Sequence, residues 1–278
     1  MGAILSAAIA VLLLQVKPPI QYELKIGDAY TYEMTYGEKG GSDGSVTCKL
    51  RVECRAKKDE KAPARKPADY LLRFTLSDFK CSFPQERDSE RMKEVLATIK
   101  RFSFTAEMDR SGELHTTDLQ QAIQDFTRDA SRKKHQALEP IKSMVGTIWF
   151  GLFPWFDTSF PEDQSNRVCI RDRDWGSLGV TSLNMPMQSA VYSLSPEYAE
   201  TNRRFTGRMI LWRRITEVQS AKDLGGDDIS MSLKTKMIFR EGVCEEFEIE
   251  NQQTFDNGKT SPTAFSRCKL VEQQEMDK

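Results

Sequence analysis

The feature that most constrains this chain is an alternation of apolar and polar residues with a period of two. It recurs over 22–26, 30–36, 46–54 and 102–108. Successive side chains of a β-strand point to opposite faces of the sheet, so this pattern predicts strands with one buried face and one solvated face. Such strands are typical of an antiparallel sheet, because parallel sheets are buried on both faces.

The alternation changes parity within the stretch 70–83. The apolar face passes through Leu76 and then continues from Phe79, one residue out of step. A β-bulge near Ser77 and Asp78 would return both parts to one face and bend the strand.

Two hairpins are predicted at 102–114 and 229–249. In each, the apolar residues of the two strands share the same parity, so the connecting loop must be odd in length. Three-residue loops that end at Gly112 and Gly242 fit this requirement, because glycine suits the left-handed position of a G1 bulge. In the second hairpin this register forms two pairs of opposite charge on the outer face, Lys236 with Glu246 and Lys234 with Glu248.

Three stretches favour helices. The first covers 86–100, and the second begins at a capping box formed by Thr117 and Gln120. Pro140 suits the first turn of the third helix. This helix runs into 144–156, thirteen residues without a charge, of which five are aromatic. A helix that is apolar all round predicts burial in the core, in a membrane interface or under a ligand.

Together these patterns predict an α+β fold: a mainly antiparallel, strongly curved β-sheet or open barrel of eight to ten strands, covered by two or three helices. We expect one β-rich domain over 20–271, with a helical insert at about 86–156 and a possible sub-boundary near 157–185. Residues 272–278 are expected to form a tail.

The N-terminal residues 1–19 are expected to be a signal peptide or an N-terminal anchor. Residues 3–16 carry no charge, which is about the length of a signal-peptide apolar region and too short for a transmembrane helix. No Lys or Arg precedes this run and no clear cleavage site follows it. Gly2 and Ser6 also match the myristoylation pattern, which is the alternative. We therefore expect an exported protein that touches a membrane only through this segment.

The chain has six cysteines, which allow up to three disulfides in an exported protein and fifteen possible pairings. A bond between Cys48 and Cys54 is not expected, because six residues of one predicted strand separate them by about 20 Å. Buried free thiols are the alternative for Cys48, Cys54 and Cys81. The full set is Cys48, Cys54, Cys81, Cys169, Cys244 and Cys268.

Charge and histidine content argue against several classes of function. A formal net charge of −1 gives no electrostatic basis for a nucleic-acid partner, and two histidines leave little room for imidazole chemistry. Residues 40–44 match G-x-S-x-G by letter, but they lie in a polar loop between two predicted strands instead of a strand-to-helix turn. We expect no enzyme activity, no cofactor and no metal.

The order of motifs resembles an uncharacterised family of secreted bacterial β-rich domains. The resemblance lies in the leader, the run Leu24–Asp28 before a tyrosine-rich strand, the hairpin Met108–Leu114, two helices and then Leu152-Phe153-Pro154. In this chain Trp155 and Phe156 follow, where that family has Leu-Pro. The resemblance implies a curved antiparallel sheet with packed helices, and implies no activity or site residues.

The predicted function is a non-catalytic exported binding or carrier domain for a lipid or another hydrophobic ligand. A curved sheet that closes over an aromatic helix would form an apolar concavity. The same residues could instead simply fill the core. A structural or interaction module of the cell envelope, with an envelope protein as partner, is the second alternative, and a hydrolytic enzyme is the least expected. The candidate lining residues are Trp149, Phe150, Phe153, Trp155, Phe156, Tyr30, Tyr32, Tyr36, Phe74 and Phe104.

Overall fold

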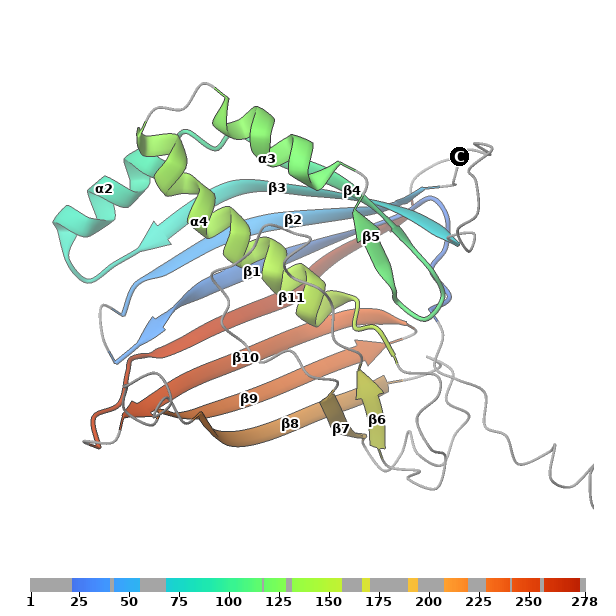
Figure 1. Cartoon of the computed structure of the whole chain (residues 1–278). Coiled ribbons are helices and arrows are strands. Elements are labelled where there is room, and N and C mark those ends of the chain that lie inside the picture. The colour runs from blue at the N-terminus through green and yellow to red at the C-terminus, as the bar shows by residue number, and fades with distance from the viewer. Residues whose placement is uncertain are drawn as a thin grey trace, which may run out of the picture.

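The computed structural model describes residues 22–40, 43–55, 69–116, 118–128, 132–156, 167–170, 190–194, 208–219, 229–240, 242–255 and 258–275. Within them, eleven strands form one antiparallel sheet (Figure 1). The strands are β1 (Asp28–Lys39), β2 (Ser45–Arg55), β3 (Tyr70–Ser82), β4 (Phe102–Met108), β5 (Leu114–Thr116), β6 (Arg167–Ile170), β7 (Ala190–Leu194), β8 (Arg208–Gln219), β9 (Ile229–Arg240), β10 (Val243–Phe255) and β11 (Thr263–Glu275).

The sheet consists of two meanders joined side by side. Its order is β5-β4-β3-β2-β1-β11-β10-β9-β8-β7-β6, so the first and last of the described strands pair in the middle. The described strands at the two ends of this order, β5 and β6, do not pair with each other, and the described sheet is therefore open. The prediction of a mainly antiparallel open sheet is confirmed, although the described chain is mostly β and has more strands than the eight to ten expected.

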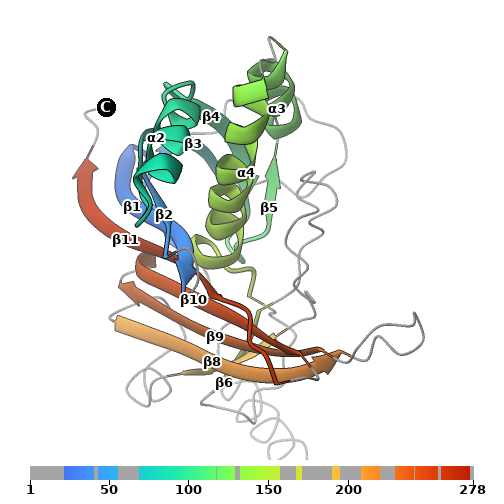
Figure 2. The same ribbon diagram turned by 90° about the vertical axis from the view of Figure 1, so that its left-hand side faces the viewer.

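Helices lie against one face of the sheet, which bends around them (Figure 2). Helix α4 crosses the face over β1 and β11, and the π-helix η1 that continues it packs on β10. Helices α2 and α3 contact β3 and β4. We call this the concave face, and the opposite one the outer face. The helices are α2 (Glu86–Leu96), α3 (Leu119–Thr127), α4 (Arg132–Thr147) and η1 (Ile148–Leu152).

The helix starts differ from two predictions. Pro140 lies inside α4, which already begins at Arg132, and not in the first turn of a helix. Helix α3 begins at Leu119, preceded by Asp118, whose side chain makes no capping hydrogen bond. Thr117 of the predicted capping box lies outside the described residues.

The predicted bulge in β3 is confirmed. The register with β2 shifts between the pairs Thr47–Lys80 and Lys49–Ser77, so Cys48 faces two residues of β3. Asp78 takes the left-handed conformation, with a φ of 53°. Phe79 is consequently turned toward the core, against which it packs.

The first hairpin also follows the prediction. Met108 pairs with Leu114, and the backbone hydrogen bond from Asp109 N to the oxygen of Glu113 leaves a three-residue loop. Gly112 in that loop has a φ of 92°.

The predicted register of the second hairpin is wrong by two residues. Arg240 pairs directly with Val243, and an extra residue lies further along β10, between Cys244 and Glu246. The ladder therefore places Lys236 opposite Glu248 and Lys234 opposite Glu250. A bulge after a two-residue connection restores the same parity as a three-residue loop, so the apolar pattern could not distinguish the two arrangements.

The predicted strand at 22–26 is also wrong. These residues form no strand, and β1 begins only at Asp28. Tyr22 donates its backbone N–H to the oxygen of Arg110 at 2.7 Å, and its backbone oxygen accepts a hydrogen bond from the hydroxyl of Tyr70 at 2.9 Å. The alternation here reflects attachment to the first hairpin, not pairing in the sheet.

Charged side chains of opposite sign alternate across the strands on the outer face. Glu33 lies between Lys49 and Lys269 in the register. Arg267 donates to Glu248 at 2.6 Å. Opposite charges at neighbouring positions stabilise a sheet and fix its register, so this pattern accounts for the near-zero net charge.

The five cysteines whose side chains are described are all free, so no predicted disulfide forms among them. Cys48 and Cys268 flank Met34 on neighbouring strands of the concave face. Burial raises the pKa of the Cys48 thiol to about 12, which keeps it protonated and unreactive. The alternative of buried free thiols is confirmed for Cys48 and Cys54, whereas Cys81 is only partly buried. Cys169 lies outside the residues with described side chains.

The leader 1–19 lies outside the described residues, and the domain boundaries stay predictions. Strand β11 extends to Glu275, into the predicted tail. In the described part of the chain, no helix is both long and apolar enough to cross a membrane.

Candidate ligand-binding site

The structure brings most of the described aromatic candidates together in one apolar core on the concave face. The rings of Phe74 on β3 and Phe104 on β4 stack with centroids 4.9 Å apart, and Phe153 meets Phe74 edge-on at 6.0 Å. Six candidates are at most 4% exposed: Tyr30, Tyr32, Phe74, Phe104, Phe153 and Phe156.

These contacts are those of a packed core, because the rings touch one another at ordinary stacking distances. Trp155 and Tyr36 are less buried than the other candidates. Trp149 and Phe150 lie in η1, but their side chains are outside the described part. That these residues line a ligand site stays a prediction.

The apolar segment 144–156 is attached firmly at its C-terminal end. Gly151 lies so close to Phe247 of β10 that a Cβ atom would meet the ring. The hydroxyl of Tyr22 donates to the backbone oxygen of Pro154 at 3.1 Å, and Phe156 N donates to the oxygen of Ser111 at 3.0 Å. The end of η1 is therefore fixed both to the sheet and to the first hairpin.

Helix α4 itself is held mainly by apolar contacts. Ala137, Ile141, Met144 and Val145 are all at most 1% exposed and belong to the same core as the sheet residues beneath them. Such contacts are not directional, so a helix held by them can shift at less cost than one held by buried hydrogen bonds.

Two polar residues interrupt the apolar concave face at the C-terminal half of the sheet. Thr235 on β9 is 3% exposed, although it follows the parity of Met237 and Phe239. Asn251 on β10 follows the parity of Phe247 and Ile249. Neither residue is among those predicted from the sequence. The signal that could have found them is a polar residue at an inward position of an otherwise apolar alternation.

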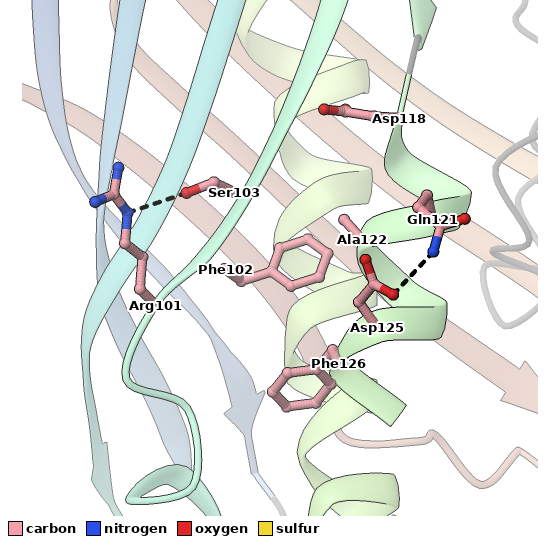
Figure 3. Close-up of a pocket in the computed structure, with 8 residues that line it drawn as sticks. All are labelled: Arg101, Phe102, Ser103, Asp118, Gln121, Ala122, Asp125 and Phe126. Carbon is pink, nitrogen blue, oxygen red and sulfur yellow. Dashed lines mark hydrogen bonds between the residues drawn. The ribbon is translucent and has the colours of Figure 1, made fainter. Parts of the chain in front are cut away.

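A separate pocket of about 360 Å³ lies between the start of β4 and helix α3 (Figure 3). Phe102 and Phe126 meet edge-on there, with centroids 6.1 Å apart. Asp118 accepts a hydrogen bond from Thr105 N at 2.6 Å, and Asp125 accepts one from Gln121 at 2.8 Å. The remaining lining residues are Arg101, Ser103 and Ala122.

The pocket contains none of the predicted lining residues, and both of its carboxylates already accept hydrogen bonds from the protein. Strand β5 ends opposite Ala106, so it does not pair with Thr105 of β4. The side chain of Asp118 accepts the hydrogen bond from the backbone N–H of Thr105 that a longer β5 would have accepted. We therefore assign these two carboxylates a structural role.

Tyr30 and Asp28 form a pair of ionisable groups on the concave face. Burial, and then the neighbouring Asp28, raise the pKa of Tyr30, whose hydroxyl donates to Asp28 at 3.2 Å. His115 lies on the surface, 3.3 Å from Glu113. Within the described ranges, no cluster of His, Cys, Asp or Glu could hold a metal ion.

No family model matches the chain, and no curated protein matches it. A solved structure described as "Lipid-protein interactions in lipovitellin" is similar, with a TM-score of 0.47 and 9% sequence identity. The similarity covers 92% of this chain but 26% of that chain. A similarity of this extent assigns neither a family nor a function.

Proposed function

We propose that the chain is a non-catalytic, exported binding domain that holds a hydrophobic ligand, such as a lipid, on the concave face of its sheet. The supporting observation is the open, curved sheet, whose apolar concave face is covered by the separate helix α4. A closed barrel has an interior fixed by its strand number and tilt. An open sheet can instead admit a ligand beside α4 without breaking a strand pair.

The energetics of such a ligand are favourable. Each buried methylene group contributes about 0.8 kcal/mol, so an acyl chain of about 16 carbons gains on the order of 10 kcal/mol before the costs of binding. Phe247 lies against η1, and Met237 and Phe239 on the neighbouring strand β9 are also apolar and fully buried. A ligand would have to replace the core contacts of these residues by contacts of its own.

Export rests on the uncharged leader and on the resemblance to secreted β-rich domains. Sequencing the N-terminus of the protein isolated from its host tests this part. Removal of about 19 residues supports export by a cleaved signal peptide. Retention of the leader in a membrane fraction supports an anchor, and an acylated Gly2 overturns export.

Ligand binding is tested by native mass spectrometry of the protein from its own host, followed by titration with N-phenyl-1-naphthylamine, an uncharged apolar probe. We expect a co-purifying lipid mass and saturable fluorescence enhancement. A protein with the bare mass and no probe binding would refute the proposal, and recovery of an envelope protein with it would then favour the interaction module.

A matched pair of variants locates the site. Met237 and Lys236 are neighbours in β9, but Met237 is fully buried on the concave face and Lys236 is exposed on the outer face. We expect Met237→Gln to weaken probe binding and Lys236→Gln to leave it unchanged. Circular dichroism must show that both variants are folded. Equal binding by both variants would place the ligand elsewhere.

A further inference from the structure

Two buried polar atoms on the concave face have no hydrogen-bond partner in the structure. They are Oγ1 of Thr235 and Oδ1 of Asn251. Among the described side chains, these two are the buried nitrogen or oxygen atoms that lack a hydrogen-bond partner. Buried polar groups are almost always hydrogen-bonded, because leaving one unpaired costs stability. Each such atom therefore needs an explanation.

The two atoms belong to neighbouring positions on one face. Thr235 pairs with Ile249, and Asn251 pairs with Leu233, so Thr235 and Asn251 are diagonal neighbours on β9 and β10. Diagonal neighbours are about 7–8 Å apart between Cα atoms. One small polar group between them can reach both atoms at normal hydrogen-bond distances.

The chemistry of the pair is complementary. A threonine hydroxyl can donate or accept, and the Oδ1 atom of asparagine accepts. A ligand hydroxyl fits both, because it can accept from Thr235 while it donates to Asn251. The charged side chains of Lys234 on β9 and Glu250 on β10 lie on the outer face, where they form an ion pair with each other.

The apolar surroundings indicate where the rest of such a ligand would lie. On β9 the concave face continues from Thr235 to Met237 and Phe239, and on β10 it leads from Asn251 back to Phe247 beneath η1. A polar end beside Thr235 and an apolar path toward η1 together describe an amphipathic molecule.

We infer that Thr235 and Asn251 bind the hydroxyl-bearing head group of an amphipathic lipid, such as a monoacylglycerol, whose acyl chain lies along the concave face. This inference rests on the proposed function and specifies the polar end of its ligand.

The test compares ligands with and without a hydroxyl. Monooleoylglycerol and 1-octadecene each compete with N-phenyl-1-naphthylamine on the full chain. We expect the wild type to prefer monooleoylglycerol by about tenfold, which corresponds to one or two hydrogen bonds, and Thr235→Val to lose most of this preference. The control is Thr35→Val, which removes a hydroxyl that lies 3.3 Å from that of Thr47 on the outer face.

A second measurement needs no ligand. Thr235→Val removes an unpaired buried oxygen and should raise the melting temperature of the ligand-free protein, whereas Thr35→Val should not raise it. A lower melting temperature for Thr235→Val than for the wild type would show that an ordered water already bonds to the hydroxyl, and would overturn the inference.

The outcomes separate the two proposals. If the wild type binds neither ligand nor probe, the proposed function fails. If it binds both ligands equally, only the head-group assignment fails. Oleic acid is the third arm, because Arg213 of β8 is opposite Thr235 in the register. A clear preference for oleic acid over monooleoylglycerol would overturn an uncharged head group.

Discussion

Replacement of Gly151 by alanine tests how tightly η1 is held to the sheet. A Cβ atom at this position would lie under 3.0 Å from Cγ, Cδ1 and Cδ2 of the Phe247 ring. Phe247 is fully buried, so the ring can move only within the core and against the residues packed around it. The added methyl group must therefore push η1 away from β10 or distort the core.

Two effects of opposite sign decide the size of the change. Alanine stabilises a helix over glycine by about 1 kcal/mol, because glycine loses more backbone entropy on folding. Overpacking of a well-packed core costs about 1–3 kcal/mol, and the contact with three ring atoms argues for the upper part of that range. We expect Gly151→Ala to lower the free energy of unfolding by about 1–2 kcal/mol.

Urea unfolding followed by circular dichroism measures this change as a lower midpoint at an unchanged slope. The variant Phe247→Leu supplies the matched background, because a smaller side chain leaves room for the methyl group. In that background Gly151→Ala should be neutral or stabilising. A single Gly151→Ala variant as stable as the wild type would refute the close packing of η1 on the sheet.

Three further predictions concern the sheet. Asp78→Gly should raise the free energy of unfolding by about 0.5 kcal/mol, measured by urea unfolding, since glycine adopts the left-handed conformation without strain; a loss would show that the aspartate side chain stabilises the bulge. The hydrogen bond from Lys39 lowers the pKa of Glu250, so this carboxylate adds stability above the unfolded pKa of about 4.3, and the contribution disappears as the pH falls through the folded value. Melting curves of Glu250→Gln should therefore lie below the wild type at pH 7 and converge with it in acid; a constant gap would contradict this. Burial raises the pKa of Cys48 to about 12, whereas Cys81 is only partly buried, so Ellman's reagent at pH 8 should label Cys81 first and Cys48 only after unfolding; equal native labelling rates would be the contrary result.

Local sequence patterns predict strands β1 to β4 well, because each of them carries an unambiguous inward face. The parity change between Leu76 and Phe79 requires a β-bulge, and the structure contains one at this position. In the second hairpin, a short connection followed by a bulge near Glu245 produces the same parity as a longer loop. Periodicity records which face a residue takes and not how many residues lie in the turn.

The candidate site shows a different limit. Aromatic residues such as Phe74 and Phe153 were identified as concave-face residues, and they are, but composition cannot distinguish a lined cavity from a filled core. A single polar residue such as Thr235 hardly weakens a strong apolar alternation, so the pattern still predicts an ordinary strand. Its importance depends on the absence of a hydrogen-bond partner, which only the three-dimensional arrangement shows.

The pairing of β1 with β11 has a consequence for how the protein is made. β1 ends at Lys39 and β11 begins at Thr263, so at synthesis rates of about 5–20 residues per second β1 waits on the order of ten seconds or more for its neighbour. During this time one edge of β1 has no native partner, and such an edge is open to pairing with other chains. We therefore expect the nascent chain to need a chaperone or a translocation channel until its last strand arrives.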